Sequence, residues 1–162
     1  MLATLVPAAP AFALDNDALD SDLGSADEVL MILGHGASAI GHGKPHPTGQ
    51  QAGNTAAINQ HGNHHTATIN QSGNGHYALI DQRGRGNDAT ISQQGYGHAA
   101  AIVQHGSANT AAIHQAGKGN GAAIVQRGNG NSAHIGQMSS GLHLDVVQQI
   151  GNGQTFSSHA AR

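Results

Sequence analysis

Amide and imidazole side chains recur in this chain at a spacing of eleven residues, and each can donate and accept hydrogen bonds. The glutamine series is Gln60, Gln71, Gln82, Gln93, Gln104, Gln115, Gln126 and Gln137. Six residues before these glutamines, from the second onward, stand Asn87, Asn109, Asn120 and Asn131, with His65, His76 and His98 in the equivalent places. Amide side chains stacked at the spacing of neighbouring strands form hydrogen-bonded ladders. The chemistry that they predict is hydrogen bonding between copies of one unit, which favours assembly over catalysis.

The residues between these amides indicate the strands that would position them. Isoleucine stands two residues before each glutamine, at Ile58, Ile69, Ile80, Ile91, Ile102, Ile113, Ile124 and Ile135. Alanine stands four residues before, at Ala67, Ala78, Ala89, Ala100, Ala111, Ala122 and Ala133. This alternation predicts a strand with one selected face. Glycine stands between one strand and the next, where the backbone must turn, at Gly62, Gly73, Gly84, Gly95, Gly106, Gly117 and Gly128.

Each eleven-residue unit is therefore predicted to be a strand followed by a turn, so that two units complete a circuit of 22 residues. Stacked circuits would place Ile over Ile and Gln over Gln at about 4.8 Å, the spacing between strands of a sheet. The predicted fold is all-β, a cross-β solenoid with inward Ala and Ile between amide ladders. Because its ends are open strand edges, we expect copies to stack end to end into amyloid fibres.

The array is imperfect at both ends, as terminal repeats commonly are. Before Gln60 the inward set is intact, but the turn glycine is out of register. After Gln137 we expect Leu142, Leu144, Val146 and Gln148 in the places of Asn, Ala, Ile and Gln. The expected regions are an export signal at 1–13, an acidic and Gly/His-rich targeting segment and linker at 14–49, the repeat solenoid at 50–148, and a degenerate C-terminal tail at 149–162.

The first residues fit an export signal. Ala11, Phe12 and Ala13 match the small-x-small cleavage pattern after a short apolar stretch, although no basic residue precedes them, so we expect the n-region to be truncated and the mature chain to begin near Leu14. A disordered Ala/Pro-rich tail is the alternative. Six of the nine acidic residues then precede the apolar run Val29–Leu33. Residues 19–33 could form an amphipathic helix, or stay unfolded until a partner captures them.

Composition excludes several classes of function. Charged residues make up 9% of the chain and aromatic residues 2%, which is typical neither of an ordinary globular domain nor of a charged disordered chain. A net charge of −3 does not indicate a nucleic-acid partner. There is no cysteine for disulfides, and no apolar run is long enough to cross a membrane.

The motif Gln-x-Gly-x-x-Asn-x-Ala-x-Ile-x-Gln resembles the curlin repeat of bacterial curli, the secreted amyloid of biofilm matrices, from about Asn54 to Gln148. The resemblance implies a secreted structural subunit of a cell-surface fibre, or fimbrium, that acts in biofilm and surface adhesion. It implies as partners the chain itself, other curlin subunits and the outer-membrane curli secretion machinery.

Curlins comprise a major fibre subunit and a minor nucleator. Residues 77–104 look more like the nucleator, because Ala-x-Ile-x-Gln stands in every unit and the last repeat is degenerate. In that subunit the divergent terminal repeat is tied to surface attachment. A major fibre subunit is the alternative, and the departures from the family pattern are histidine at three Asn positions and a short, imperfect first repeat.

The residue after each glutamine is expected to point outward. On alternate units these residues fall into one column of His61, Arg83, His105 and Arg127. Like charges stacked at circuit spacing repel. The column could be a gatekeeper that slows premature assembly, a surface for anionic matrix polymers, or a solvated face with neither role. Asp81 and Asp88 lie close enough in sequence to neutralise part of it.

His76 and His98 fall in the inward Asn column, where neutral imidazole can mimic the Asn amide. Charged imidazole would carry positive charge into the ladder, so we expect acid below a His pKa of about 6.5 to slow assembly. The linker histidines His35, His42 and His46 could bind Zn or Cu weakly, but no tight ligand spacing indicates a metal site.

No cofactor site and no enzyme activity are expected, because the chain has no cysteine nucleophile or framework of paired carboxylates, and its glycines have turn spacing. The remaining alternative is a monomeric ice- or surface-binding solenoid. That function needs an outward array of one residue type, and the column that begins with Thr68 and Thr90 continues with Ala112 and His134.

Overall fold

The computed structural model describes residues 53–141 and 144–160, and this part of the chain is made of ten strands joined by short turns. The expected export signal at 1–13 and targeting segment at 14–49 lie outside the described residues. The strands are β1 (Thr55–Asn63), β2 (Thr66–Asn74), β3 (Tyr77–Arg85), β4 (Asp88–Tyr96), β5 (Ala99–Ser107), β6 (Thr110–Lys118), β7 (Gly121–Asn129), β8 (Ser132–Gln137), β9 (Leu144–Ile150) and β10 (Thr155–Ala160). None of the described residues form a helix that could span a membrane.

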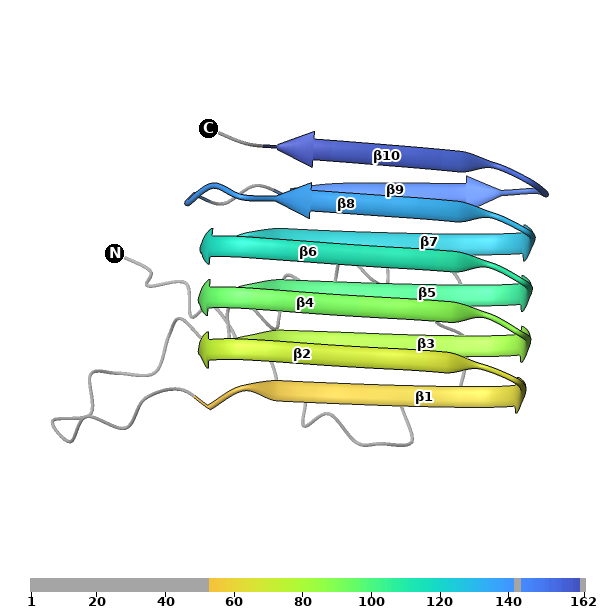
Figure 1. Cartoon of the computed structure of the whole chain (residues 1–162), viewed down its shortest axis with the longest axis horizontal. Helices are drawn as coiled ribbons and strands as arrows, with labels where there is room; N and C mark the ends of the chain where they lie inside the picture. The colour runs from red at the N-terminus through yellow and green to blue at the C-terminus, as the bar shows by residue number, and fades with distance from the viewer. Residues whose placement is uncertain (1–52, 142–143, 161–162) are drawn as a thin grey trace, which may run out of the picture.

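Successive strands alternate between two parallel sheets. Sheet A has the order β1-β3-β5-β7-β9, and sheet B has the order β10-β8-β6-β4-β2. Each strand therefore lies beside the strand two places later in the sequence, and the two sheets face each other (Figure 1). The chain winds upward as a solenoid of about five circuits, which confirms the predicted fold class.

The register of the strands follows the 22-residue period. Ile80 pairs with Ile102, and Gln82 pairs with Gln104 in sheet A. Ile91 and Gln93 pair with Ile113 and Gln115 in the same way in sheet B. A slip of one residue would turn every inward side chain outward, so the buried face fixes this register.

The core lies between the two sheets and is built from the Ala and Ile positions of the motif. The isoleucines from Ile80 to Ile135 are fully buried, and the alanines beside them are at most 3% exposed. Ala67 and Ile69, in the first circuit, are half-buried and pack against the same cluster. Burial of each isoleucine contributes about 2 kcal/mol, so the middle circuits hold most of the apolar stabilisation.

The recurrent position of glycine in each unit is explained by close stacking of the turns. Gly106 has φ of +123°, and a Cβ added there would overlap the carbonyl oxygen of Gly128 in the next circuit. A second glycine follows two residues later in most turns, such as Gly86 with φ of +65° and open space around it. His64 and Ala108 take this second position with φ of 60° and 54°. The first glycine is thus required by space and conformation, the second by conformation alone.

The structure corrects the register expected after Gln137. Val147 pairs with Ile124 and Gln149 pairs with Gln126, whereas Val146 and Gln148 were expected in those places. Val147 is 5% exposed and Val146 is 41% exposed, which fixes the inward face. Asp145, not Leu144, lies opposite Ala122.

The reason for this shift is the turn that follows β9. Gly151 lies over Gly128, and its N–H donates to the carbonyl oxygen of Arg127 at 2.9 Å. This turn position has φ of +121°, which favours glycine, so Gly151 takes it and the extra residue of this circuit is accommodated before β9. The spacing between the stacked glutamines therefore becomes 23 residues.

Regular stacking also continues beyond residue 148, the predicted end of the solenoid. Residues 151–154 form a further turn, and β10 pairs with β8 in sheet B. Phe156, Ser158 and Ala160 then occupy the places opposite Ala133, Ile135 and Gln137. The motif has been lost in β10, but the backbone pairing has been kept.

Candidate functional site

The glutamine side chains form two continuous ladders along the stack. In sheet A each Nε2 donates to the Oε1 of the glutamine in the next circuit, at 2.7–2.8 Å from Gln60 through Gln82, Gln104 and Gln126 to Gln149. In sheet B the ladder runs from Gln71 through Gln93 and Gln115 to Gln137 at 2.9–3.0 Å. All of the bonds point the same way, so one end of each ladder is an acceptor and the other is a donor.

The same amides also tie the two sheets together. The Nε2 of Gln82 in sheet A donates to the carbonyl oxygen of Thr66 in sheet B at 3.0 Å. Gln93 in sheet B makes the equivalent bond to Tyr77 of sheet A at 3.0 Å. Each interior glutamine thus uses both of its N–H groups while fully desolvated, which is the condition under which a buried amide stabilises a fold.

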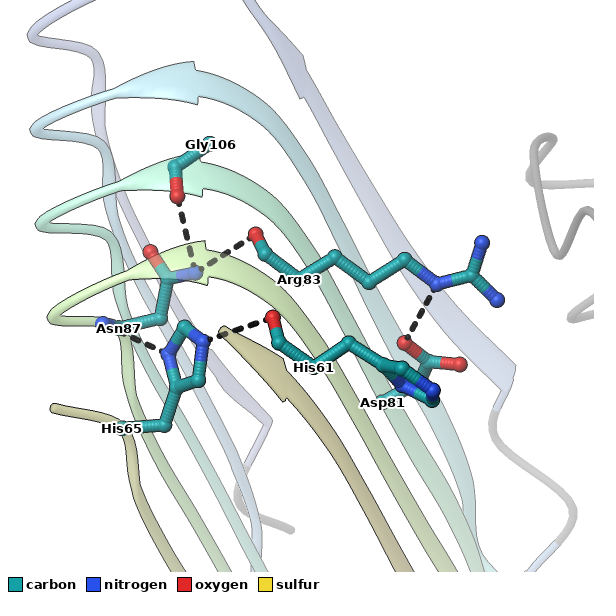
Figure 2. A network of polar contacts seen from close by, with 6 residues as sticks. All are labelled: His61, His65, Asp81, Arg83, Asn87 and Gly106. Atoms are coloured by element: carbon teal, nitrogen blue, oxygen red, sulfur yellow. Dashed lines mark hydrogen bonds and ion pairs between the residues drawn. The ribbon is translucent and has the colours of Figure 1, made fainter. Parts of the chain in front are cut away.

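The Asn positions form a second set of ladders at the turns. The backbone N–H of Asn109 donates to Oδ1 of Asn87 at 3.1 Å. The Nδ2 of Asn87 donates to the carbonyl oxygens of Arg83 and Gly106, both at 3.1 Å (Figure 2). One side chain therefore closes its own turn and binds the turn above it.

Histidine at His65 reproduces two of these three bonds. Figure 2 shows His65, whose Nδ1 accepts from the backbone N–H of Asn87 at 3.3 Å and whose Nε2 lies 3.1 Å from the carbonyl oxygen of His61. The Nδ1 stands where Asn has Oδ1, and Nε2 stands where Asn has Nδ2. This arrangement requires neutral imidazole with its proton on Nε2.

His76 and His98 stack one above the other in the buried turn column. Their ring centroids are 5.1 Å apart and their planes differ by 5°. The Nδ1 of His98 accepts from the N–H of Asn120 at 3.1 Å, and Nε2 lies 3.0 Å from the carbonyl oxygen of Gln94. Burial lowers the pKa of His98, partly opposed by the hydrogen bond to Gln94, and the neighbouring His76 lowers it further.

The basic column lies in register on the outer side of sheet A. His61, Arg83, His105 and Arg127 pair successively across β1, β3, β5 and β7. The Nε of Arg83 lies 3.4 Å from Oδ1 of Asp81, which is 1% exposed (Figure 2). Asp81 thus offsets part of the charge, as its place in the sequence suggested, whereas Asp88 belongs to β4 of sheet B.

Both ends of the stack are open in the described part of the chain. The edge strands are β1 and β9 in sheet A, and β2 and β10 in sheet B. Ile58 of β1 is 45% exposed and Phe156 of β10 is 42% exposed, although both hold inward positions of the repeat. These two surfaces are where a further copy could add strands.

Two features of the site are not predicted by the motif as defined from the sequence. One is the second turn glycine, at Gly75, Gly86, Gly97, Gly119 and Gly130, which counting seven residues back from each glutamine would have revealed. The other is a row of apolar side chains on the outer side of sheet A. It repeats every 22 residues, as at Leu79, Ala101 and Ala123, and so is hidden in an eleven-residue motif.

No group of three or more metal-ligating side chains is found within residues 53–141 and 144–160. His35, His42 and His46 lie outside these ranges. The chemistry present in the described residues is hydrogen bonding, close stacking and burial, which is the chemistry of an assembly unit.

The comparison with known families agrees with this chemistry. The curlin-associated repeat matches residues 52–84, 66–95 and 84–117, which together cover β1 to β5 and most of β6. No curated protein and no solved structure matches the chain. The repeat region at residues 52–117 is therefore similar to the curlin-associated repeat.

Proposed function

We propose that the chain is a secreted subunit of a curli-like amyloid fibre, and that it acts as the nucleator. The observation that carries the proposal is the direction of the glutamine ladders. Every Nε2 donates toward the C-terminal end of the stack, from Gln60 upward and from Gln71 upward. A second copy could place its first circuit on the last circuit of the first and continue the sheet A ladder from Gln149. In sheet B, Ala160 stands in the next glutamine place and interrupts the ladder after Gln137. Repetition of that contact gives an open, polar filament.

The two ends of the stack support a nucleator over a major subunit. The first circuit carries Asn54, Ala56, Ile58 and Gln60, the complete inward set of the motif. The last strand has Phe156 and Ser158 in the places of Ala and Ile. A major subunit would need matching surfaces at both ends, whereas a nucleator needs one template. A major fibre subunit remains the second candidate, because regular stacking extends to β10.

The similarity to the curlin-associated repeat supports a biological setting. We propose export through the outer-membrane curli secretion machinery, with residues 1–13 as signal and residues 14–49 as targeting segment. The fibre would lie at the cell surface and act in biofilm and adhesion. Other curlin subunits would be its partners, and anionic matrix polymers could bind near the basic column. The polar, mixed outer columns of sheet B give no support to ice binding.

The experiment is a lag-time measurement. A trace of freshly purified chain 14–162 is added to a candidate major curlin, beside the major curlin alone and chain 14–162 alone. Loss of the lag supports the nucleator. If the chain alone forms cross-β fibres and leaves its partner's lag unchanged, it is a major subunit. If it stays monomeric and inert in both tests, the amyloid function is wrong.

A further inference from the structure

The outer faces of the two sheets differ in composition. Tyr77, Leu79, Ala99, Ala101, Val103, Ala123 and Val125 form a second hydrophobic cluster, separate from the core between the sheets. All of them lie at outward positions of β3, β5 and β7 in sheet A. We call this set the outer apolar face.

The side chains of the outer apolar face are buried, although they point away from the core. Leu79, Val103 and Val125 are fully buried. In sheet B the residues at comparable outward positions, such as Thr90, Ser92 and His114, are half-buried or exposed. An outward position is therefore not buried by the solenoid itself.

The described residues contain no element that covers the outer apolar face. Within 53–141 and 144–160 every strand belongs to sheet A or sheet B, and the remaining residues form turns at the strand ends. A surface of this kind needs an apolar occupant, because water contact would cost about 25 cal/mol for each Å² of apolar area.

The border of this face carries positive charge. Arg83 and Arg127 lie in the outermost column, and their Nε atoms have no hydrogen-bond partner within the described part of the chain. Asp81 offsets Arg83 through the 3.4 Å contact, but Arg127 has no such carboxylate within these residues. An occupant with apolar and acidic side chains would match both parts of the surface.

We propose that residues 14–33 of the same chain dock on the outer apolar face. This segment contains the apolar run Val29–Leu33, preceded by six of the nine acidic residues. Residues 14–49 hold those six acids and one lysine, whereas residues 50–162 hold three acids and five basic residues. The two parts of the chain therefore carry opposite net charge, which favours their association.

The dimensions fit this docking. Five extended residues span about 16 Å. Three neighbouring strands, as in β3, β5 and β7, cover about 14 Å of sheet. Residues 34–53 link the run to the start of β1 and can reach at most about 65 Å. Since β1 is the edge strand of sheet A, the tether begins beside the face that the run would cover.

Docking of this kind would cover the side of the solenoid and leave its two ends open. Association of copies would then be directed to the strand edges, because the outer apolar face is occupied. The docking is intramolecular and does not depend on fibre formation, so its failure can be told apart from failure of the nucleator function.

A crosslinking experiment tests which face the segment meets. The chain has no cysteine, so Ile32→Cys can be combined with Asn59→Cys on the outer side of sheet A. The matched control combines Ile32→Cys with Asn70→Cys, since Asn59 and Asn70 both precede the ladder glutamine in β1 and β2. Full-length chains, half of them labelled with ¹⁵N, are treated with a short bismaleimide and analysed by mass spectrometry.

We expect crosslinks within one chain, at a yield several-fold higher from position 59 than from position 70. Equal yields at the two positions, or no crosslink at either, would overturn the proposal. Crosslinks from position 59 that join labelled to unlabelled chains would also overturn it, because a second copy would then occupy the face.

A second measurement leaves the face unmutated. The rate at which Cys-reactive reagent modifies the Asn59→Cys chain should rise several-fold when Leu30→Asp and Ile32→Asp are introduced. As a first control, Ala37→Asp with Ala39→Asp adds the same charge outside the apolar run and should leave the modification rate unchanged. As a second control, Leu30→Asp with Ile32→Asp should leave the rate unchanged when the cysteine is at position 70. No change at position 59, or an equal change at both positions, contradicts docking.

Discussion

The first and the last circuits of the solenoid both end in open strands, but they present different side chains. β1 keeps Ala56, Ile58 and Gln60 at its inward positions. β10 has Phe156, Ser158 and Ala160 opposite the Ala, Ile and Gln of β8. Backbone pairing thus survives loss of the motif, because parallel strands bond through main-chain groups. The side chains decide which strand can add to an edge. The two ends of the stack therefore offer the same backbone groups for pairing but different inward side chains for templating.

The largest effect is expected from a matched pair of glycines. Gly106 and Gly151 have nearly equal φ, +123° and +121°. A Cβ at Gly106 would overlap the carbonyl oxygen of Gly128, whereas at Gly151 the nearest atom is Nε2 of Gln154 at 3.4 Å. Gly106→Ala should destabilise the folded chain by more than about 4 kcal/mol. Gly151→Ala should cost only the backbone strain, about 1–2 kcal/mol.

Chemical denaturation of the two variants, monitored by circular dichroism, measures the difference. Equal losses would mean that strain alone explains the turn glycines and that stacking contacts in the middle add nothing. Seeding by Gly151→Ala should also stay intact if the template is the β1 and β2 end.

The next largest effect separates folding from templating. Ile102 is fully buried in the middle and Ile58 is 45% exposed at the first circuit. Ile102→Ala should cost about 2–5 kcal/mol of unfolding free energy. Ile58→Ala should cost much less, because half of its side chain already contacts water, yet it should lengthen the lag of a seeded partner. If Ile58→Ala leaves seeding unchanged, the β1 and β2 end is not the template.

The comparison can also be sharpened by repairing the weaker end. The triple change Phe156→Ala, Ser158→Ile and Ala160→Gln restores the motif in β10. We expect the repaired chain alone to form fibres several-fold faster, because both ends would then carry the ladder residues. Phe156→Ala alone is the control, since it removes the bulky ring without adding a ladder residue. A repaired chain that assembles at the original rate would show that the C-terminal end takes no part in stacking.

The sequence was sufficient to predict the middle of the solenoid and insufficient at its end. Through Gln137 one spacing places every inward residue, because a single face is buried and any slip is costly. At Val146-Val147 and Gln148-Gln149 two registers are equally apolar and equally amide-bearing. Gly151 decides between them, and its partner Gly128 lies 23 residues earlier, which breaks the period.

The outer apolar face was missed for a related reason. The eleven-residue motif contains only what every unit shares, whereas this face belongs to alternate units only. Val103 pairs with Val125 on the outer side of sheet A. At the comparable outward positions of sheet B, Ser92 pairs with His114. The difference between the sheets becomes visible only when the chain is divided into circuits of two units.

A smaller effect is expected from pH. Burial lowers the pKa of His98 below the ordinary histidine value of about 6.5. The unfolded chain then takes up the proton more readily than the folded chain, so this contribution to stability is present above about pH 6.5 and is lost as the pH falls toward the lowered pKa. Protonation of Nδ1 would also place two N–H groups against each other at Asn120.

We therefore expect a longer lag and a lower denaturation midpoint at pH 5 than at pH 7.5, the range in which histidine titrates. His98→Asn keeps the ladder, because Asn holds this place in other units, and should reduce the dependence. If His98→Asn leaves the pH dependence of the lag and of the denaturation midpoint unchanged, that dependence arises from groups outside this ladder.

The smallest effect concerns the position of the second turn glycine. Another residue holds this position once in the first circuit and once in the middle of the solenoid. His64 and Ala108 hold it with φ of 60° and 54°. Replacement by glycine removes about 1–2 kcal/mol of strain from the left-handed backbone, which stabilises the folded chain. It also increases the entropy of the unfolded chain, which destabilises the folded chain by about 0.5–1 kcal/mol. Ala108→Gly should therefore stabilise the chain by about 0.5–1 kcal/mol. His64→Gly should raise the global denaturation midpoint less, because terminal elements open before the middle does. Equal gains from the two substitutions would show that the first circuit unfolds together with the interior. The first and last circuits would then differ only in the side chains that they present.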